Sequence, residues 1–179
     1  TAAVSTYLAG FLSPAEADDL FAWLQGCVAW ETETILLFGK RRLVPRLVSW
    51  FGDSGLSYRY SGRPHPGTGW PPELAGLRSR VGAQLSATPN FLLLNRYRDG
   101  ADSMGWHRDD EAGLGALIAS ISLGATRSFL LRESNASRSQ SLKLEHGSLL
   151  LFDGRTSHAL PKTRRLVGER INLTFRVLQ

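Results

Sequence analysis

A histidine and an aspartate one residue apart, His107 and Asp109, stand in the stretch GWHRDDEAG at positions 105–113. On an extended segment these two side chains point to the same side, and Asp110 points to the other. His107 and Asp109 could therefore bind one metal ion. A charged surface loop would have the same composition, so the motif alone leaves both interpretations open.

A metal site at this position needs a third ligand, which must come from the other histidines of the chain. His65 stands in the Pro-Gly stretch RPHPGTGW, and His146 precedes Gly147; a surface turn would explain either residue. His158, in FDGRTSHALP, follows an expected strand and a glycine turn, which makes it the best-placed candidate. Two histidines and one carboxylate on one face are typical of non-haem Fe(II) oxygenases, which keep positions open for O₂ and a co-substrate.

The last expected strand, RINLTFRV, has two different faces. Apolar side chains alternate with polar ones, and the polar face consists of Arg170, Asn172, Thr174 and Arg176. The two arginines are ~20 Å apart on an ideal strand. Their long side chains could lean together and hold a small dicarboxylate such as 2-oxoglutarate. A solvent-exposed polar face is the alternative.

The length of 179 residues predicts one domain over residues 1–179, and the apolar content of 42% predicts that it is globular. No apolar run approaches the ~20 residues that span a bilayer, and the N-terminus lacks the features of a signal peptide. Cys27 is the only cysteine, which favours a reducing, cytoplasmic setting, or a nuclear one if the protein is eukaryotic. The net charge of +5 and the basic clusters at 39–46 and 163–165 are compatible with nucleic-acid binding, although solvated turns would also explain the clusters.

Two helices are expected, at 13–28 and 71–85. Ser13 is a suitable N-cap for the first helix, and Gly26 is expected to end it. After Pro89, short apolar segments separated by turns predict an antiparallel sandwich or barrel. The expected strands lie at about 34–40, 55–62, 90–97, 117–124, 127–133, 140–147, 148–154 and 170–178.

Five motifs, NRYRDG, HRDDE, HGSLLLF, SHALP and RINLTFR, stand in an order and spacing that resembles the AlkB family of Fe(II)/2-oxoglutarate dioxygenases. The chain looks most like the DNA-repair branch found in animal nuclei, and the resemblance extends from LFGK to the C-terminus. It implies an α+β, mainly β fold, with N-terminal helices and a double-stranded β-helix (jelly-roll) core. The core would occupy about 90–179, and a nucleotide-recognition lid would occupy about 31–66.

The resemblance also assigns roles by position. It implies three iron ligands, which are His107, Asp109 and His158. It implies 2-oxoglutarate contacts from two strands, which are Asn95, Tyr97, Arg170, Asn172 and Arg176. The residues implied on the substrate side are Phe38, Arg46, Tyr58, Tyr60, Asp110 and Glu111.

Within the lid, the resemblance places Tyr58 and Tyr60 at a base pocket. Tyr60 stands where the repair branch has a phenylalanine stacked on the damaged base, and Glu111 matches an acid near the base edge. Asp110 is expected to support the pocket through an arginine such as Arg46.

The implied activity is oxidative demethylation of bases such as 1-methyladenine and 3-methylcytosine in DNA, using Fe(II), O₂ and 2-oxoglutarate. Succinate and formaldehyde would be released. Phe38 of LFGK matches a hairpin residue that enters duplex DNA, with packing in the core as the alternative. The protein is expected to act as a monomer. The same chemistry on RNA or protein, and a non-catalytic jelly-roll module that binds nucleic acid, are the other interpretations.

Overall fold

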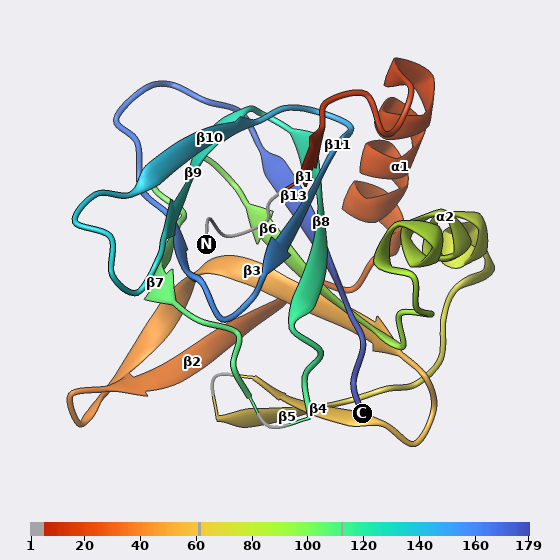
Figure 1. Cartoon of the computed structure of the whole chain (residues 1–179), viewed down its shortest axis with the longest axis horizontal. Coiled ribbons are helices and arrows are strands. Elements are labelled where there is room, and N and C mark those ends of the chain that lie inside the picture. Colours follow the sequence, from red (N-terminus) through yellow and green to blue (C-terminus); the bar gives the residue numbers. More distant parts are fainter. Residues whose placement is uncertain (1–5, 61, 112) are drawn as a thin grey trace.

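The computed structural model describes residues 6–60, 62–111 and 113–179 (Figure 1). Residues 1–5 lie outside the described residues. They are the first part of the N-terminal stretch that was expected to lack the features of a signal peptide. The helices are α1, Pro14–Cys27, and α2, Ala75–Leu85, which a single 3-10 turn at Pro72–Leu74 precedes. The strands are β1 Thr6–Leu8, β2 Glu31–Leu37, β3 Lys40–Gly52, β4 Ser57–Tyr60, β5 Arg63–Pro66, β6 Phe91–Tyr97, β7 Met104–His107, β8 Leu117–Gly124, β9 Arg127–Arg132, β10 Gln140–Leu144, β11 Ser148–Asp153, β12 Ser157–Leu160 and β13 Arg170–Arg176.

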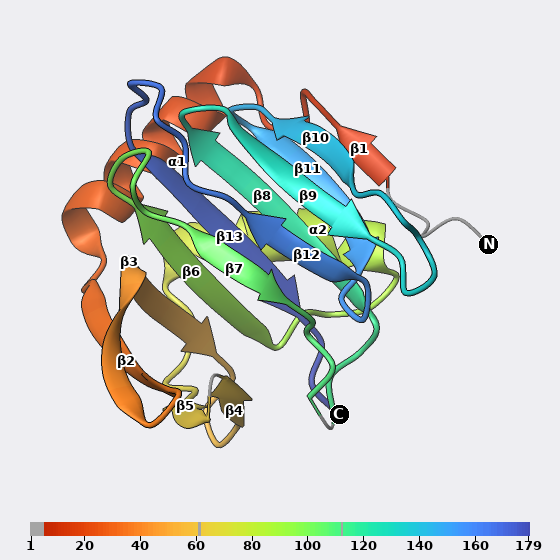
Figure 2. The ribbon, with the colours of Figure 1, turned by 90° about the vertical axis from the view of Figure 1, so that its left-hand side faces the viewer.

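Two antiparallel sheets face each other, and both helices lie on the outer side of the larger one (Figures 1 and 2). The larger sheet has the order β1-β11-β8-β13-β6-β3-β2, and the smaller sheet has the order β10-β9-β12-β7. Strands β4 and β5 form a separate hairpin. This arrangement confirms the expected α+β, mainly β, jelly-roll fold. No helix in the described part of the chain has the length and apolar character that crossing a membrane would need.

The first helix begins where the sequence predicts, whereas α2 begins at Ala75, four residues after the expected start at position 71. The Ser13 side chain accepts a hydrogen bond from the Glu16 amide, and the Glu16 carboxylate accepts one from the Ser13 amide, which forms a capping box at the start of α1. The expected end at Gly26 is wrong by one residue, because α1 continues through Cys27 and an extended Val28 caps it. Both helices pack their apolar faces on the larger sheet, through residues that include Leu24 and Val81.

The segment between the helices differs from its expected layout. The strand expected at 34–40 is β2 followed by a two-residue turn, Phe38–Gly39. The chain then returns as β3, which pairs with both β2 and β6. The segment 31–63 is mainly β, as the sequence predicts, and the hairpin expected at Phe38 implies a returning strand. The bounds of β3 were not predicted, because its first three residues are basic and Pro45 interrupts its apolar pattern. Through β3 the segment 31–66 is hydrogen-bonded to the larger sheet.

Strand β13 lies at the centre of the larger sheet, between β8 and β6, and all of its residues are buried. Ile171, Leu173 and Phe175 belong to the core beneath the helices. The polar side chains on the opposite face line a cavity between the two sheets. The alternative of a solvent-exposed polar face is therefore wrong, and the buried polar groups need another explanation.

Candidate metal and co-substrate site

Strands β7 and β12 bring the two histidines together. His107 and His158 are direct partners across this strand pair, and Asp109 follows β7 by two residues. One nitrogen of each histidine and one carboxylate oxygen of Asp109 all lie within 4.8 Å of one another. The structure thus gathers the three residues that the sequence singled out, whereas His65 and His146 lie elsewhere with other partners.

Backbone carbonyls orient both imidazole rings. Nδ1 of His107 lies 2.8 Å from the Gly105 oxygen, and Nδ1 of His158 lies 2.8 Å from the Thr156 oxygen. Each Nδ1–H therefore donates to a carbonyl, which leaves the Nε2 lone pair as the free ligand atom. Both Nε2 atoms lie 3.7 Å from an oxygen of Asp109.

The protonation states at this cluster suit metal binding. Burial lowers the pKa of His158 to about 4 and also lowers the pKa of His107, so both rings are neutral at pH 7. Burial alone would raise the pKa of Asp109, but the charge of Arg176, at 2.8 Å from its Oδ2, keeps that pKa below its usual range. Two neutral imidazoles and one carboxylate result.

The residues fit a divalent iron ion. The Oδ1 atom of Asp109 is buried and has no hydrogen-bond partner among the described residues. A buried carboxylate oxygen without a partner is costly unless a cation or a donor meets it. Nitrogen and oxygen ligands from two histidines and one carboxylate are the set that non-haem Fe(II) uses.

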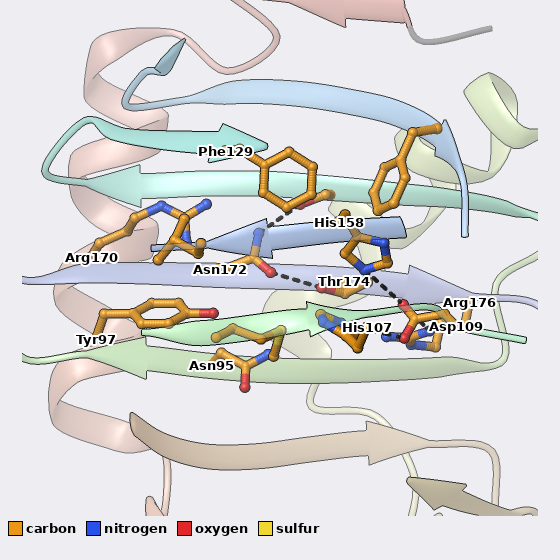
Figure 3. Close-up of a pocket in the computed structure, with 14 residues that line it drawn as sticks. Asn95, Tyr97, His107, Asp109, Phe129, His158, Arg170, Asn172, Thr174 and Arg176 are labelled. Carbon is orange, nitrogen blue, oxygen red and sulfur yellow. Dashed lines mark hydrogen bonds and ion pairs between the residues drawn. The ribbon is translucent and has the colours of Figure 1, made fainter. Parts of the chain in front are cut away.

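The polar face of β13 lines the cavity beside this cluster (Figure 3). Arg170, at one end, donates from Nη2 to the Ser122 hydroxyl at 2.8 Å, and its guanidinium lies 5.4 Å from the Tyr97 ring centroid. Its Nε is buried without a partner in the described part of the chain. Burial lowers the pKa of Arg170 to about 10, which still leaves it charged at pH 7. A buried cation with a spare donor fits a carboxylate ligand.

Asn172 and Arg176 are already engaged within the protein. Asn172 donates to the Ser120 hydroxyl and to the Ile121 carbonyl, and its oxygen accepts from Thr174 at 2.7 Å. Arg176 pairs with Asp109 instead of leaning toward Arg170, so the expected grip of two arginines on one dicarboxylate is not what the structure presents. Arg170 is the arginine at the far end of the cavity from the histidines (Figure 3).

The residues expected to form the base pocket contact one another. The Tyr58 and Tyr60 rings are stacked with centroids 6.1 Å apart, and the Tyr58 hydroxyl donates to the Glu111 carboxylate at 3.1 Å. The guanidinium of Arg46 contacts Tyr60. Asp110 is exposed and forms no hydrogen bond with Arg46 within the described ranges, so its expected support of the pocket through Arg46 does not occur here.

Phe38 occupies the tip of the β2–β3 hairpin and is 96% exposed. Its φ of 50° and that of Gly39 at 74° are both positive, as a two-residue hairpin turn requires. The alternative that Phe38 packs in the core is wrong.

Several cavity residues were not singled out from the sequence. They are apolar or small side chains with no distinctive local pattern, and only their strands' alternation could have indicated them. They are Met104, Ser120, Phe129, Phe152 and Leu160.

Comparison with known proteins agrees with this geometry. The model of the 2OG-Fe(II) oxygenase superfamily matches residues 5–176. The chain therefore belongs to the 2OG-Fe(II) oxygenase superfamily and, within it, to the AlkB family.

The AlkB assignment rests on curated relatives. The chain is 41% identical over 179 residues to the mouse (Mus musculus) DNA oxidative demethylase ALKBH2, and the match covers 90% of this chain and 75% of the relative. It is 40% identical to the bovine (Bos taurus) protein of the same name, over 90% of this chain and 64% of the relative. Mouse alpha-ketoglutarate-dependent dioxygenase alkB homolog 3 is 38% identical, over 94% of this chain and 64% of the relative. The chain thus spans less than two thirds of the length of some of these relatives.

Solved structures support the fold. The OsALKBH1 structure superposes with a TM-score of 0.68 at 21% identity, over 97% of each chain. A 2OG-Fe(II) oxygenase family oxidoreductase from Burkholderia pseudomallei superposes with a TM-score of 0.67 at 17% identity, over 96% of this chain and 84% of the other.

Proposed function

We propose that this chain is an Fe(II)- and 2-oxoglutarate-dependent dioxygenase that oxidatively demethylates alkylated bases, such as 1-methyladenine and 3-methylcytosine, in DNA. One observation carries the proposal: a single cavity is lined both by the His107, Asp109 and His158 cluster and by Arg170 with its unpartnered Nε. The names of the curated relatives, DNA oxidative demethylase and alpha-ketoglutarate-dependent dioxygenase, support the reaction class and the substrate.

His107, Asp109 and His158 would hold Fe(II). Together with 2-oxoglutarate and O₂, the bound iron would supply the oxidising chemistry that converts an N-methyl group to formaldehyde. The protein keeps both imidazoles neutral and turned toward the ion through the carbonyls of Gly105 and Thr156. Arg176 holds Asp109 ionised and in place.

Arg170 would bind the carboxylate of 2-oxoglutarate that lies furthest from the metal. The Ser122 hydroxyl and the Tyr97 ring fix its guanidinium before the ligand arrives. Such pre-organisation reduces the entropy lost on binding. Asn95 lines the same cavity and contributes an amide donor, while Asn172 with its three internal hydrogen bonds forms a rigid part of the wall.

Tyr58, Tyr60 and Glu111 would receive the methylated base. Stacked aromatic rings offer a face to any base, and a carboxylate can accept a hydrogen bond from the amino group of adenine or cytosine. Reaching a base in a duplex requires flipping it out, which costs a few kcal/mol and least for a lesion that cannot pair. We propose that Phe38, exposed at the hairpin tip, fills the gap that the flipped base leaves.

The proposal is tested by measuring formaldehyde and succinate from oligonucleotides that carry 1-methyladenine or 3-methylcytosine, with Fe(II) and 2-oxoglutarate. Both products should form in equal amounts and only with the methylated DNA. RNA of the same sequence and a methylated peptide serve as competing substrates. Product from RNA or peptide but not from DNA would refute the substrate assignment, and no succinate from any of them would refute the enzyme class.

A further inference from the structure

Arg46 lies between Tyr60 of the β4–β5 hairpin and Asn95 of the catalytic cavity, and its side chain is hydrogen-bonded to both. The residue belongs to β3 and is only 6% exposed. Its Nε donates to the Asn95 Oδ1 atom at 2.8 Å, and its Nη2 donates to the Tyr60 hydroxyl at 3.2 Å. Its Nη1 donates to the Ser103 carbonyl at 3.3 Å. Because a guanidinium is planar and rigid, these acceptors are fixed relative to one another.

On the cavity side, Arg46 determines which way the Asn95 amide faces. Arginine can only donate, so the atom that meets its Nε must be the amide oxygen of Asn95. Figure 3 shows this oxygen turned toward β3, away from Asn172 and Arg170. The amide nitrogen of Asn95 is therefore the group left to donate to a ligand in the cavity that Asn95 lines.

On the side of the β4–β5 hairpin, Arg46 fixes the ring of Tyr60. This ring is 5% exposed and stacks on Tyr58 at an interplanar angle of 23°. The Tyr60 hydroxyl accepts from Arg46, whereas the Tyr58 hydroxyl donates to Glu111. A phenylalanine in place of Tyr60 would keep the ring and lose the hydrogen bond. The two tyrosines thus present similar rings, and only one of them is hydrogen-bonded to Arg46.

We infer that Arg46 is a positioning residue that couples binding of the methylated base to binding of 2-oxoglutarate, an inference that rests on the proposed function. A base stacked on Tyr60 restrains that ring, and the ring restrains the guanidinium and through it the Asn95 amide. When 2-oxoglutarate binds afterwards, the Arg46 and Asn95 side chains are already ordered, so less conformational entropy is lost on its binding. Coupling of this kind is reciprocal, and typical values change affinity by about 5- to 150-fold.

The test is equilibrium binding of 2-oxoglutarate to the Mn(II)-loaded protein, by calorimetry, with and without a saturating single-stranded oligonucleotide that carries 1-methyladenine. We expect the oligonucleotide to lower the Kd of 2-oxoglutarate by about 5-fold or more. In Tyr60→Phe this ratio should fall to near one, while the Kd of 2-oxoglutarate without DNA changes by less than about two-fold, because the Arg46–Asn95 bond remains.

Tyr58→Phe is the matched control, because it removes a hydroxyl from the stacked partner without touching Arg46. It should weaken the oligonucleotide and keep the ratio of the two 2-oxoglutarate Kd values. A ratio of one in the unsubstituted protein with both ligands bound, or an unchanged ratio in Tyr60→Phe, would refute the coupling and leave the proposed function standing. Failure of the protein to bind the methylated oligonucleotide at all would refute both.

Discussion

Strand β13 and the β2–β3 hairpin both depart from the usual rule that polar side chains are exposed and apolar ones buried. Strand β13 buries charged side chains, whereas the hairpin exposes apolar ones. The polar face of β13 is buried between two sheets, with Arg170 and Arg176 each 2% exposed. The hairpin instead leaves large apolar side chains in solvent, with Leu36 73%, Phe38 96% and Leu43 70% exposed. A buried cation is stabilised by an anionic or polar ligand, and a cluster of exposed apolar side chains is stabilised by contact with an apolar partner. The two exceptions therefore indicate two kinds of ligand.

Both exceptions also oppose folding stability. A buried charge without a full set of partners is costly, and Arg170 Nε and Arg176 Nε have none among the described residues. At the hairpin tip a phenylalanine adopts a positive φ, a conformation that asparagine or glycine would adopt more easily. Neither feature helps the chain to fold, and the proposed binding of 2-oxoglutarate and of DNA would account for both. We expect substitutions in the cavity to affect the metal and the co-substrate, and substitutions in the hairpin to affect duplex DNA.

The largest effect is expected at the metal cluster. His158→Ala removes one of three proposed iron ligands and should abolish turnover, with iron content measured in parallel. The melting temperature serves as a check of the fold. His146→Ala is the control, since His146 bonds to Asp18 and to the Gly124 amide away from the cluster. Normal activity in His158→Ala with iron lost from His146→Ala would mean that the third ligand is misassigned.

The next largest effect is expected at Arg170, at the end of β13 far from the metal cluster. Arg170→Ala should raise the KM for 2-oxoglutarate by about 10- to 100-fold, because a charge-assisted hydrogen bond is worth roughly 1.5–3 kcal/mol. The KM for DNA should change little. Arg96→Ala provides the comparison, because Arg96 lies on adjacent β6 and pairs with Glu169 outside the cavity. An unchanged KM for 2-oxoglutarate in Arg170→Ala would remove this residue from the site.

The hairpin tip is tested by Phe38→Ala. Base–aromatic stacking is worth ~1–3 kcal/mol, so repair of a duplex substrate should slow by about 5- to 100-fold. Repair of a single-stranded substrate should change little, because no duplex has to be opened. The melting temperature should be unaffected, since Phe38 is exposed. Equal losses on the two substrates would show that Phe38 has no role specific to duplex DNA.

The sequence predicts those parts of the fold that local pattern determines. The capping box at Ser13 and the apolar spacing of α2 specify both helices, and the alternation in β13 specifies which side chains share a face. Whether that face is buried depends on the second sheet, which strands distant in the sequence build. The strand pattern alone therefore predicts the polar face of β13 but leaves its burial open, and only the metal motif and the family resemblance favour a buried site.

The site shows the same division between local and distant information. The short strands β7 and β12 carry little pattern, yet their register places His107 opposite His158. Arg46 was expected to meet Asp110, whereas its partner Asn95 is 49 residues away in the sequence and lies on the neighbouring strand. Side-chain partners across that separation depend on register and packing, which composition and spacing do not encode. The pairing of Arg176 with Asp109 is a further case.

The smallest expected effect concerns the basic side chains next to the exposed hairpin tip. Arg42 lies opposite Ile35 on the β2–β3 ribbon and is exposed. If it contacts one phosphate of duplex DNA, Arg42→Gln should weaken binding a few-fold and reduce the slope of log K against log salt by about 0.9. Arg80→Gln removes the same charge from α2, where Arg80 pairs with Glu16 on the helical side of the molecule. Its slope should match that of the unsubstituted protein. Equal reductions in both variants would mean that DNA binding depends on the net charge of the protein and not on the position of Arg42. The hairpin would then differ from the rest of the surface only by its apolar tip.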